Sequence, residues 1–103
     1  MKKITRKYLQ TIGIVDAGRD AIVRRCKTRS GGVVESVIYP RLNNGSPAVA
    51  LSVNGKTVYF SLARFVYAWR YGEIGESDEA VFTDSGDVVK CTPSEARNMR
   101  RRR

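Results

Sequence analysis

Residues 47–72 constrain the fold most, because their apolar positions change from a strand-like period to a helix-like one. Val49, Leu51 and Val53 alternate with small or polar residues, which is typical of a half-buried strand. The next two residues, Asn54-Gly55, accept the positive φ that a two-residue type I′ turn requires. The sequence therefore predicts that the chain reverses here and returns as an antiparallel strand.

The turn also sets the register of this hairpin, because a two-residue loop leaves its flanking residues directly opposite each other. The apolar side chains then gather on one face of the two strands. The expected pairs are Val53 with Lys56, Leu51 with Val58, and Val49 with Phe60.

An amphipathic helix is predicted immediately after the hairpin. Ser61 is a favourable N-cap, and Gly72 suits the left-handed position that follows a helix. Between them, apolar side chains recur at the i, i+3, i+4 and i+7 positions that share one helical face. These side chains are Leu62, Phe65, Val66 and Trp69.

Length and composition narrow the class of protein. The chain has 103 residues, which suits a single domain over residues 1–103 with a modest core. Cys26 and Cys91 lie far apart in a chain without histidine, so a structural zinc site lacks its ligands. Two reduced thiols are expected, with a disulfide as the alternative. The longest apolar run, residues 65–69, is too short to span a membrane, so we expect a cytoplasmic protein. We also expect it to hold no cofactor and no metal.

The charge of the chain is strongly positive and unevenly distributed. Nineteen lysines and arginines against ten acidic residues give a net charge of +9. Residues 72–87 contain six acids and no base, so this segment carries −6 and the rest of the chain +15. Basic residues gather at both ends of the chain, where they would release counterions from a phosphate backbone. Nucleic acid, most simply duplex DNA, is the expected partner, with a solvated basic tail as the alternative.

The N-terminal half gives weaker patterns. Residues 5–10 predict a short capped helix. Residues 14–29 fit either a helix or a strand, and the glycines around them favour a strand that pairs with residues 33–39. Residues 43–46, Asn-Asn-Gly-Ser, are expected to form a loop.

The C-terminal part predicts two strands and a helix. Strands at 80–83 and 88–91 are expected on either side of a turn at 84–87. Thr92 and Glu95 form a capping box with Pro93 at the first helical position, so a helix should run from there into the terminal arginines.

Four short motifs follow one another between these elements. They read G-S-P-A-V-A-L at 45–51, N-G-K at 54–56, L-A-R-F-V at 62–66 and Y-G-E-I at 71–74. In this order they resemble the G-Y-P-x-V-x-L strand, G-K turn, V-H-R-L-V helix and Y-G-E-x-P loop of small HNH homing-type endonucleases. Many members of that family are encoded by bacteriophages and other mobile elements, so the resemblance implies a viral protein acting in the host cytoplasm.

The metal-binding core of that family has its counterpart further along the chain. The family's strand ending in D-H, its x-x-G-D turn and its T-x-x-E-N helix start look like residues 81–83, 86–87 and 92–96 here. The resemblance covers roughly residues 45–103. It implies a small α+β domain with antiparallel hairpins, a central amphipathic helix and a degenerate ββα-metal-like C-terminal half.

The chain departs from the family where the family's chemistry lies. No histidine is present to act as the general base, which must titrate near the operating pH. Oxygens of Asp84, Asp87 and Asn98 are an alternative set of magnesium ligands. The resemblance therefore implies a catalytically inactive scaffold rather than an enzyme. The degenerate family positions are Ala63, Thr83 and Ala96.

The first functional hypothesis is a nucleic-acid-binding protein that contacts phosphates mainly through its C-terminal helix. The candidate contacts are the basic residues at the two ends, those in the central turn and those on the polar face of the central helix. They are Lys2, Lys3, Arg6, Lys7, Lys56, Arg64, Arg70, Arg97, Arg100, Arg101, Arg102 and Arg103.

The second hypothesis is an inhibitor that binds a host nucleic-acid enzyme or defence complex. It uses the basic ends or the acidic segment, whose carboxylates could dock into a basic groove. The candidate docking residues are Glu73, Glu76, Asp78 and Glu79.

Overall fold

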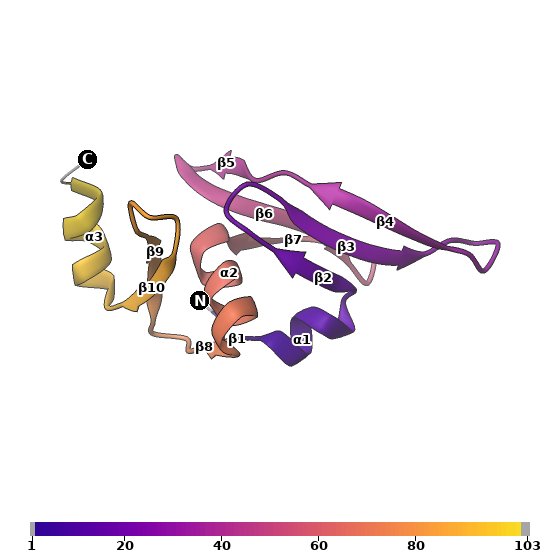
Figure 1. Ribbon diagram of the computed structural model, residues 1–103, viewed down its shortest axis with the longest axis horizontal. Coiled ribbons are helices and arrows are strands. Elements are labelled where there is room, and N and C mark those ends of the chain that lie inside the picture. The colour runs from indigo at the N-terminus through magenta and orange to yellow at the C-terminus, as the bar shows by residue number, and fades with distance from the viewer. Residues whose placement is uncertain (1, 102–103) are drawn as a thin grey trace.

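The computed structural model describes the backbone of residues 2–101 and the side chains of residues 2–98. It confirms the predicted fold class, a small α+β domain with antiparallel strand pairs around a central helix (Figure 1). In chain order the elements are β1 (Ile4–Thr5), α1 (Arg6–Thr11), β2 (Ile14–Ala17), β3 (Ile22–Lys27), β4 (Val33–Ile38), β5 (Arg41–Asn43), β6 (Ser46–Val53), β7 (Lys56–Ser61), α2 (Leu62–Tyr71), β8 (Glu73–Ile74), β9 (Glu79–Phe82), β10 (Val88–Cys91) and α3 (Pro93–Arg101).

The hairpin of β6 and β7 has the predicted register, with Leu51 opposite Val58 and Val49 opposite Phe60. Its turn residues Asn54 and Gly55 have φ values of 51° and 79°, as a type I′ turn requires. The first strand of this hairpin begins earlier than predicted. Residues 43–46 are not a loop, because Asn44-Gly45 makes a second tight turn with φ values of 54° and 80° and joins β5 to β6.

Helix α2 lies at the centre of the fold, as predicted. The Ser61 side chain accepts a hydrogen bond from the backbone N–H of Arg64, and Gly72 ends the helix with φ 107°. Phe65, Val66 and Ala68 are completely buried. The ring of Phe65 meets that of Phe60 edge-on at 5.4 Å, so the helix is fixed against the sheet that leads into it.

Residues 14–29 are extended, which confirms the strand interpretation over the helical one. They form β2 and β3, and β3 pairs along its whole length with β4. Only the first part of this hairpin contacts the core, where Ile22 is fully buried. Residues 25–37, which we call the arm, project from the domain at one end (Figure 1). The arm contributes to an elongated shape with extents of 49 × 25 × 22 Å.

The acidic connection is more structured than predicted. Two of its residues form β8, which pairs antiparallel with β1 at the start of the chain. This pairing places Ile4 opposite Ile74, and both side chains are buried in the main core. The N-terminal segment is therefore part of the domain rather than a free basic tail.

The C-terminal region has the predicted strand–strand–helix order. Strands β9 and β10 pair antiparallel, and the turn between them is stabilised by the Thr83 hydroxyl, which accepts a hydrogen bond from the N–H of Asp87. Both hydrogen bonds of the predicted capping box of α3 are formed. The Thr92 hydroxyl accepts from the N–H of Glu95, and the Glu95 carboxylate accepts from the N–H of Thr92. Ala96 packs on Val81 in a small second core. Among the helices of residues 2–101, none is long and apolar enough to cross a membrane.

Candidate nucleic-acid interface

Arg64 is not a surface residue, which contradicts its prediction as a phosphate contact on the polar face of α2. The residue is 3 % exposed. The guanidinium donates to the carbonyls of Lys2, Gly75 and Asp78 at 3.1, 2.6 and 3.0 Å. Burial lowers the pKa of Arg64, while Glu79 and Asp78 oppose that shift, and the group stays charged at neutral pH. Arg64 therefore ties helix α2 both to the start of the chain and to residues 75–78.

Arg6 is also committed to the fold. Its guanidinium donates to the carbonyls of Trp69 and Arg70, both at 2.6 Å. These carbonyls lie in the last turn of α2, where no further helical N–H is available to bond them. Arg6, near the start of the chain, thus caps the C-terminus of the central helix. Its guanidinium is already hydrogen-bonded to these two carbonyls.

Two more of the predicted contact residues form ion pairs. Lys3 lies 2.9 Å from Glu73, and this hydrogen bond raises the pKa of Lys3. Arg70 lies 3.2 Å from Asp87. The N–H of Val88 and the hydroxyl of Tyr71 also bond this carboxylate, and together these donors lower the pKa of Asp87.

The other predicted contacts with described side chains are exposed and make no ion pair within residues 2–98. Lys7 lies on α1, Lys56 begins β7 directly after the turn, Arg97 lies on α3, and Lys2 precedes β1. The side chains of Arg100–Arg103, on which the sequence prediction relied most, lie outside the described residues.

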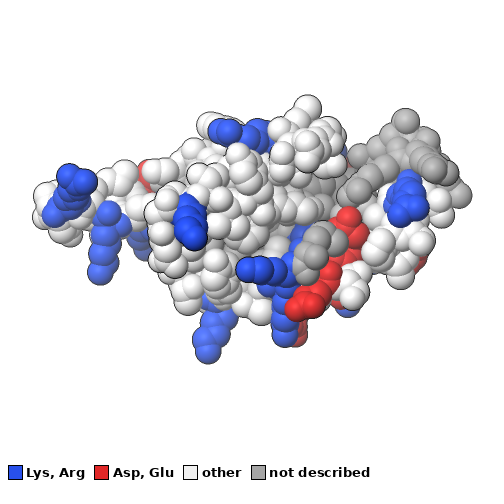
Figure 2. Space-filling view, turned by 180° about the vertical axis from the view of Figure 1, so that it is seen from behind, with Lys and Arg blue, Asp and Glu red and all other residues white. Residues whose placement is uncertain are grey.

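The arm supplies basic residues that the sequence prediction missed. Lys27 and Arg29 are exposed at its end, and neither makes an ion pair among the described side chains. Arg25 is held by Glu35 across the strands at 2.7 Å. Charge is the only signal for these residues in the sequence, because the predicted pairing with residues 33–39 does not indicate that this hairpin projects from the domain. Figure 2 shows basic side chains standing out on the arm at one end of the molecule.

The shape of the arm suits a groove. It consists of two antiparallel strands with a tight end, and every residue of β4 before Ile38 is exposed. The major groove of duplex DNA accepts a two-stranded ribbon of this kind. The arm therefore combines the shape of a two-stranded ribbon with exposed basic residues near its end.

The acidic segment does not form a free carboxylate surface. Glu73 and Asp87 are ion-paired, and the Asp78 carboxylate accepts from the N–H of Gly75 at 3.3 Å. Glu79 is largely buried, with one carboxylate oxygen 4.0 Å from the Arg64 guanidinium, so its prediction as a surface docking residue is wrong. Of the four predicted docking residues, Glu76 is the one that is exposed and without such a contact in the described structure. Figure 2 shows the acidic patch with basic side chains directly beside it.

Two of the positions that the resemblance compares with the HNH core make contacts within the fold. Ala96 is buried against Val81 and Cys91, while Thr83 is occupied with its own turn. Cys26 and Cys91 are both free thiols. No group of three or more acidic, cysteine or histidine side chains that could hold a metal ion occurs within the described part of the chain.

Searches against protein-family models, curated proteins and solved structures found no match to this chain.

Proposed function

We propose that this protein binds nucleic acid through exposed lysines and arginines at the two ends of its elongated fold. One end is the arm with Lys27 and Arg29, and the other is α3 with Arg97 and the arginines that follow it. The observation that carries the proposal is that the acidic and basic side chains differ in how many of them are already bonded within the fold. Many acidic side chains are bonded within the fold, whereas Lys27, Arg29 and Arg97 are exposed and make no ion pair among the described side chains.

The physical basis is counterion release from the phosphate backbone. Each lysine or arginine that neutralises a phosphate frees a condensed cation, so affinity rises with the number of unpaired basic groups. Lysines and arginines that already pair with carboxylates gain less, because that pair must first be broken. Duplex DNA is the proposed ligand, since its major groove admits a two-stranded ribbon such as the arm.

We propose further that the protein does not hydrolyse the nucleic acid. The counterpart of the family's general base is Thr83, whose hydroxyl accepts from the N–H of Asp87 and cannot titrate near neutral pH. The counterpart of the metal-holding side chain is Ala96, which packs in the small core. The scaffold then supplies binding alone.

A second candidate, an inhibitor that binds a protein, is favoured by a different observation. Apolar side chains of the arm are exposed, including Val33 at 58 % and Val37 at 53 %. Exposed apolar clusters of this kind mark protein contacts. In this case the arm, rather than the acidic segment, would carry the contact.

The proposal is tested by titrating a fluorescent duplex with the full chain at several salt concentrations. We expect binding that weakens steeply between about 50 and 200 mM salt, with one unit of slope for each phosphate contact. No binding at the lowest salt would contradict the proposal. A single protein captured from nuclease-treated lysate, together with salt-independent behaviour, would support the inhibitor instead.

A further inference from the structure

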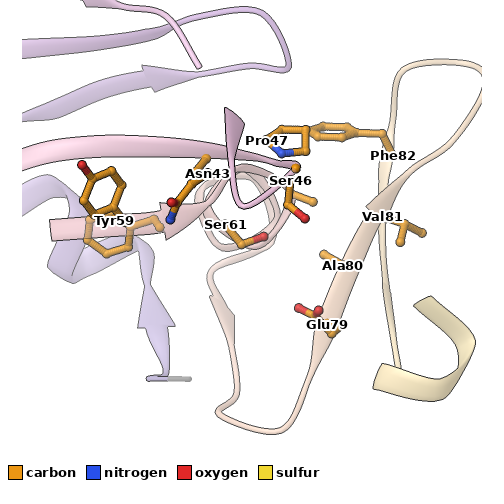
Figure 3. Close-up of a pocket in the computed structure, with 13 residues that line it drawn as sticks. Asn43, Ser46, Pro47, Tyr59, Ser61, Glu79, Ala80, Val81 and Phe82 are labelled. Atoms are coloured by element: carbon orange, nitrogen blue, oxygen red, sulfur yellow. The ribbon is translucent and has the colours of Figure 1, made fainter. Parts of the chain in front are cut away.

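A pocket of about 510 Å³ opens between the sheet β5-β6-β7 and strand β9 (Figure 3). Its size lies in the range of small-molecule sites. One wall is formed by Asn43, Ser46, Tyr59 and Ser61 from the sheet, and the opposite wall by residues 79–82 of β9. None of the residues discussed for the phosphate contacts lines this pocket, so it is a separate feature of the molecule.

The lining predicts the chemistry of what could enter. No lysine or arginine lines it, and its acidic residue, Glu79, is largely buried beside the Arg64 guanidinium, so the lining offers a phosphate no positive charge. The rings of Tyr59, Phe60 and Phe82 supply flat apolar surface, and hydroxyl and amide groups supply donors and acceptors. A planar ring that carries N–H or amino donors fits this combination.

Tyr59 offers an accessible aromatic face. Its side chain is 52 % exposed, and its partner across the sheet is Ala50, which is too small to cover a ring. The next row on the same sheet face contains Ala48 and Ser61, which are also small. The ring therefore stands at the pocket with room for a second ring against it.

Positive charge lies at the rim rather than inside. The Arg19 guanidinium lies 5.4 Å from the centre of the Phe82 ring, which lines the pocket. Arg41 is exposed and pairs through the sheet with the lining residue Ala48. A ligand with a neutral ring and an attached phosphate would find partners for both parts here.

From this arrangement we infer that the pocket receives one unstacked nucleobase of a single-stranded segment. The base stacks on Tyr59, its polar edge bonds the amide of Asn43 or the hydroxyl of Ser61, and the flanking phosphates meet Arg19 and Arg41. Amide and hydroxyl groups both donate and accept hydrogen bonds, and stacking on an aromatic ring tolerates any base. This inference rests on the proposed function and adds to it that single strands are bound at a place distinct from the duplex contacts.

The test compares Tyr59→Ala with Tyr39→Ala, which removes a tyrosine that is 71 % exposed and lies outside the pocket. Binding of a short fluorescent single strand, as DNA and as RNA, is measured beside the matching duplex. We expect Tyr59→Ala to weaken single-strand binding about tenfold and to leave duplex binding unchanged, while Tyr39→Ala changes neither. Ser46→Trp, which fills the pocket from an exposed position, should reproduce the single-strand loss.

The outcomes separate this inference from the proposed function. Equal single-strand affinities for the two tyrosine variants overturn the inference, and intact duplex binding then leaves the proposed function standing. No binding of any oligonucleotide by the unaltered chain overturns both. Binding of a lysine-rich peptide to the unaltered chain, if Tyr59→Ala abolishes it, also overturns the inference. The ligand of the pocket would then be a cationic side chain rather than a nucleobase.

Discussion

Replacing Arg64 by alanine is expected to destabilise the fold by about 3–5 kcal/mol, the cost of removing one partner from a buried charged network. The change leaves three carbonyls, of Lys2, Gly75 and Asp78, without their donor. It also leaves the buried Glu79 carboxylate without the positive charge beside it. Small domains have a total stability of about 5–15 kcal/mol, so a large part of it would be lost.

The measurement is the free energy of unfolding in urea, followed by circular dichroism. Arg97→Ala is the matched control, because this arginine is exposed and should change stability by less than about 0.5 kcal/mol. The loss of unfolding free energy in Arg64→Lys is expected to lie between those of Arg64→Ala and Arg97→Ala. An ammonium group keeps the charge but lacks the planar guanidinium that reaches several carbonyls. A value for Arg64→Ala within error of the control would contradict the role assigned to Arg64.

Replacing Arg100, Arg101, Arg102 and Arg103 by glutamine is expected to leave the fold intact and to weaken duplex binding strongly. Helix α3 is anchored to the domain before these residues, through its capping box and the buried side chain of Ala96. If all four arginines contact phosphates, the slope of log affinity against log salt should fall by up to about 3.6.

The control for this prediction replaces the same four arginines by lysine. Lysine keeps the charge and binds phosphate as a point charge, so the salt slope should be retained. Thermal unfolding of both variants should match that of the unaltered chain. Unchanged duplex affinity in the glutamine variant would remove the C-terminal arginines from the interface.

The hairpin and central helix could be predicted in detail because their signals are local. Asn54-Gly55 specifies a turn, and the caps Ser61 and Gly72 lie next to the elements they end. The same turn chemistry at Asn44-Gly45 predicts only a loop, because the short strand before it has no alternating apolar pattern. Local chemistry therefore identified the turn residues but not always the strands on both sides.

The arginines were the harder part, because their roles depend on contacts between remote segments. The periodicity of α2 predicts one apolar face that packs on the core and an opposite face that is exposed to solvent. It places Arg64 on the exposed face. In the fold, α2 is covered on this side too, by the β8 region and the start of the chain, so Arg64 becomes a buried crosslink (Figure 1). Arg6 likewise gains its role only because β1 pairs with β8.

The pocket and the arm could not be predicted for related reasons. The pocket joins residues 43–48 and 59–63 to residues 79–82, and no sequence pattern reports that juxtaposition. The valines of β4 have the composition of a buried strand, yet nothing in the domain reaches far enough to cover them. The arm is exposed because of where the fold places it, and the types of residue in its strands do not indicate this.

The most direct test of the proposed interface compares two double variants that remove the same net charge. Lys27→Gln with Arg29→Gln removes two exposed basic groups of the arm that make no ion pair with any described side chain. Lys3→Gln with Arg70→Gln removes two that already pair with Glu73 and Asp87. Duplex affinity is measured for both at one low salt concentration. We predict a clear loss for the arm variant, with a salt slope reduced by about two, and a much smaller change for the paired variant. Equal losses, or a larger loss in the paired variant, would contradict the account, because net charge rather than the unpaired groups at the ends would then determine binding.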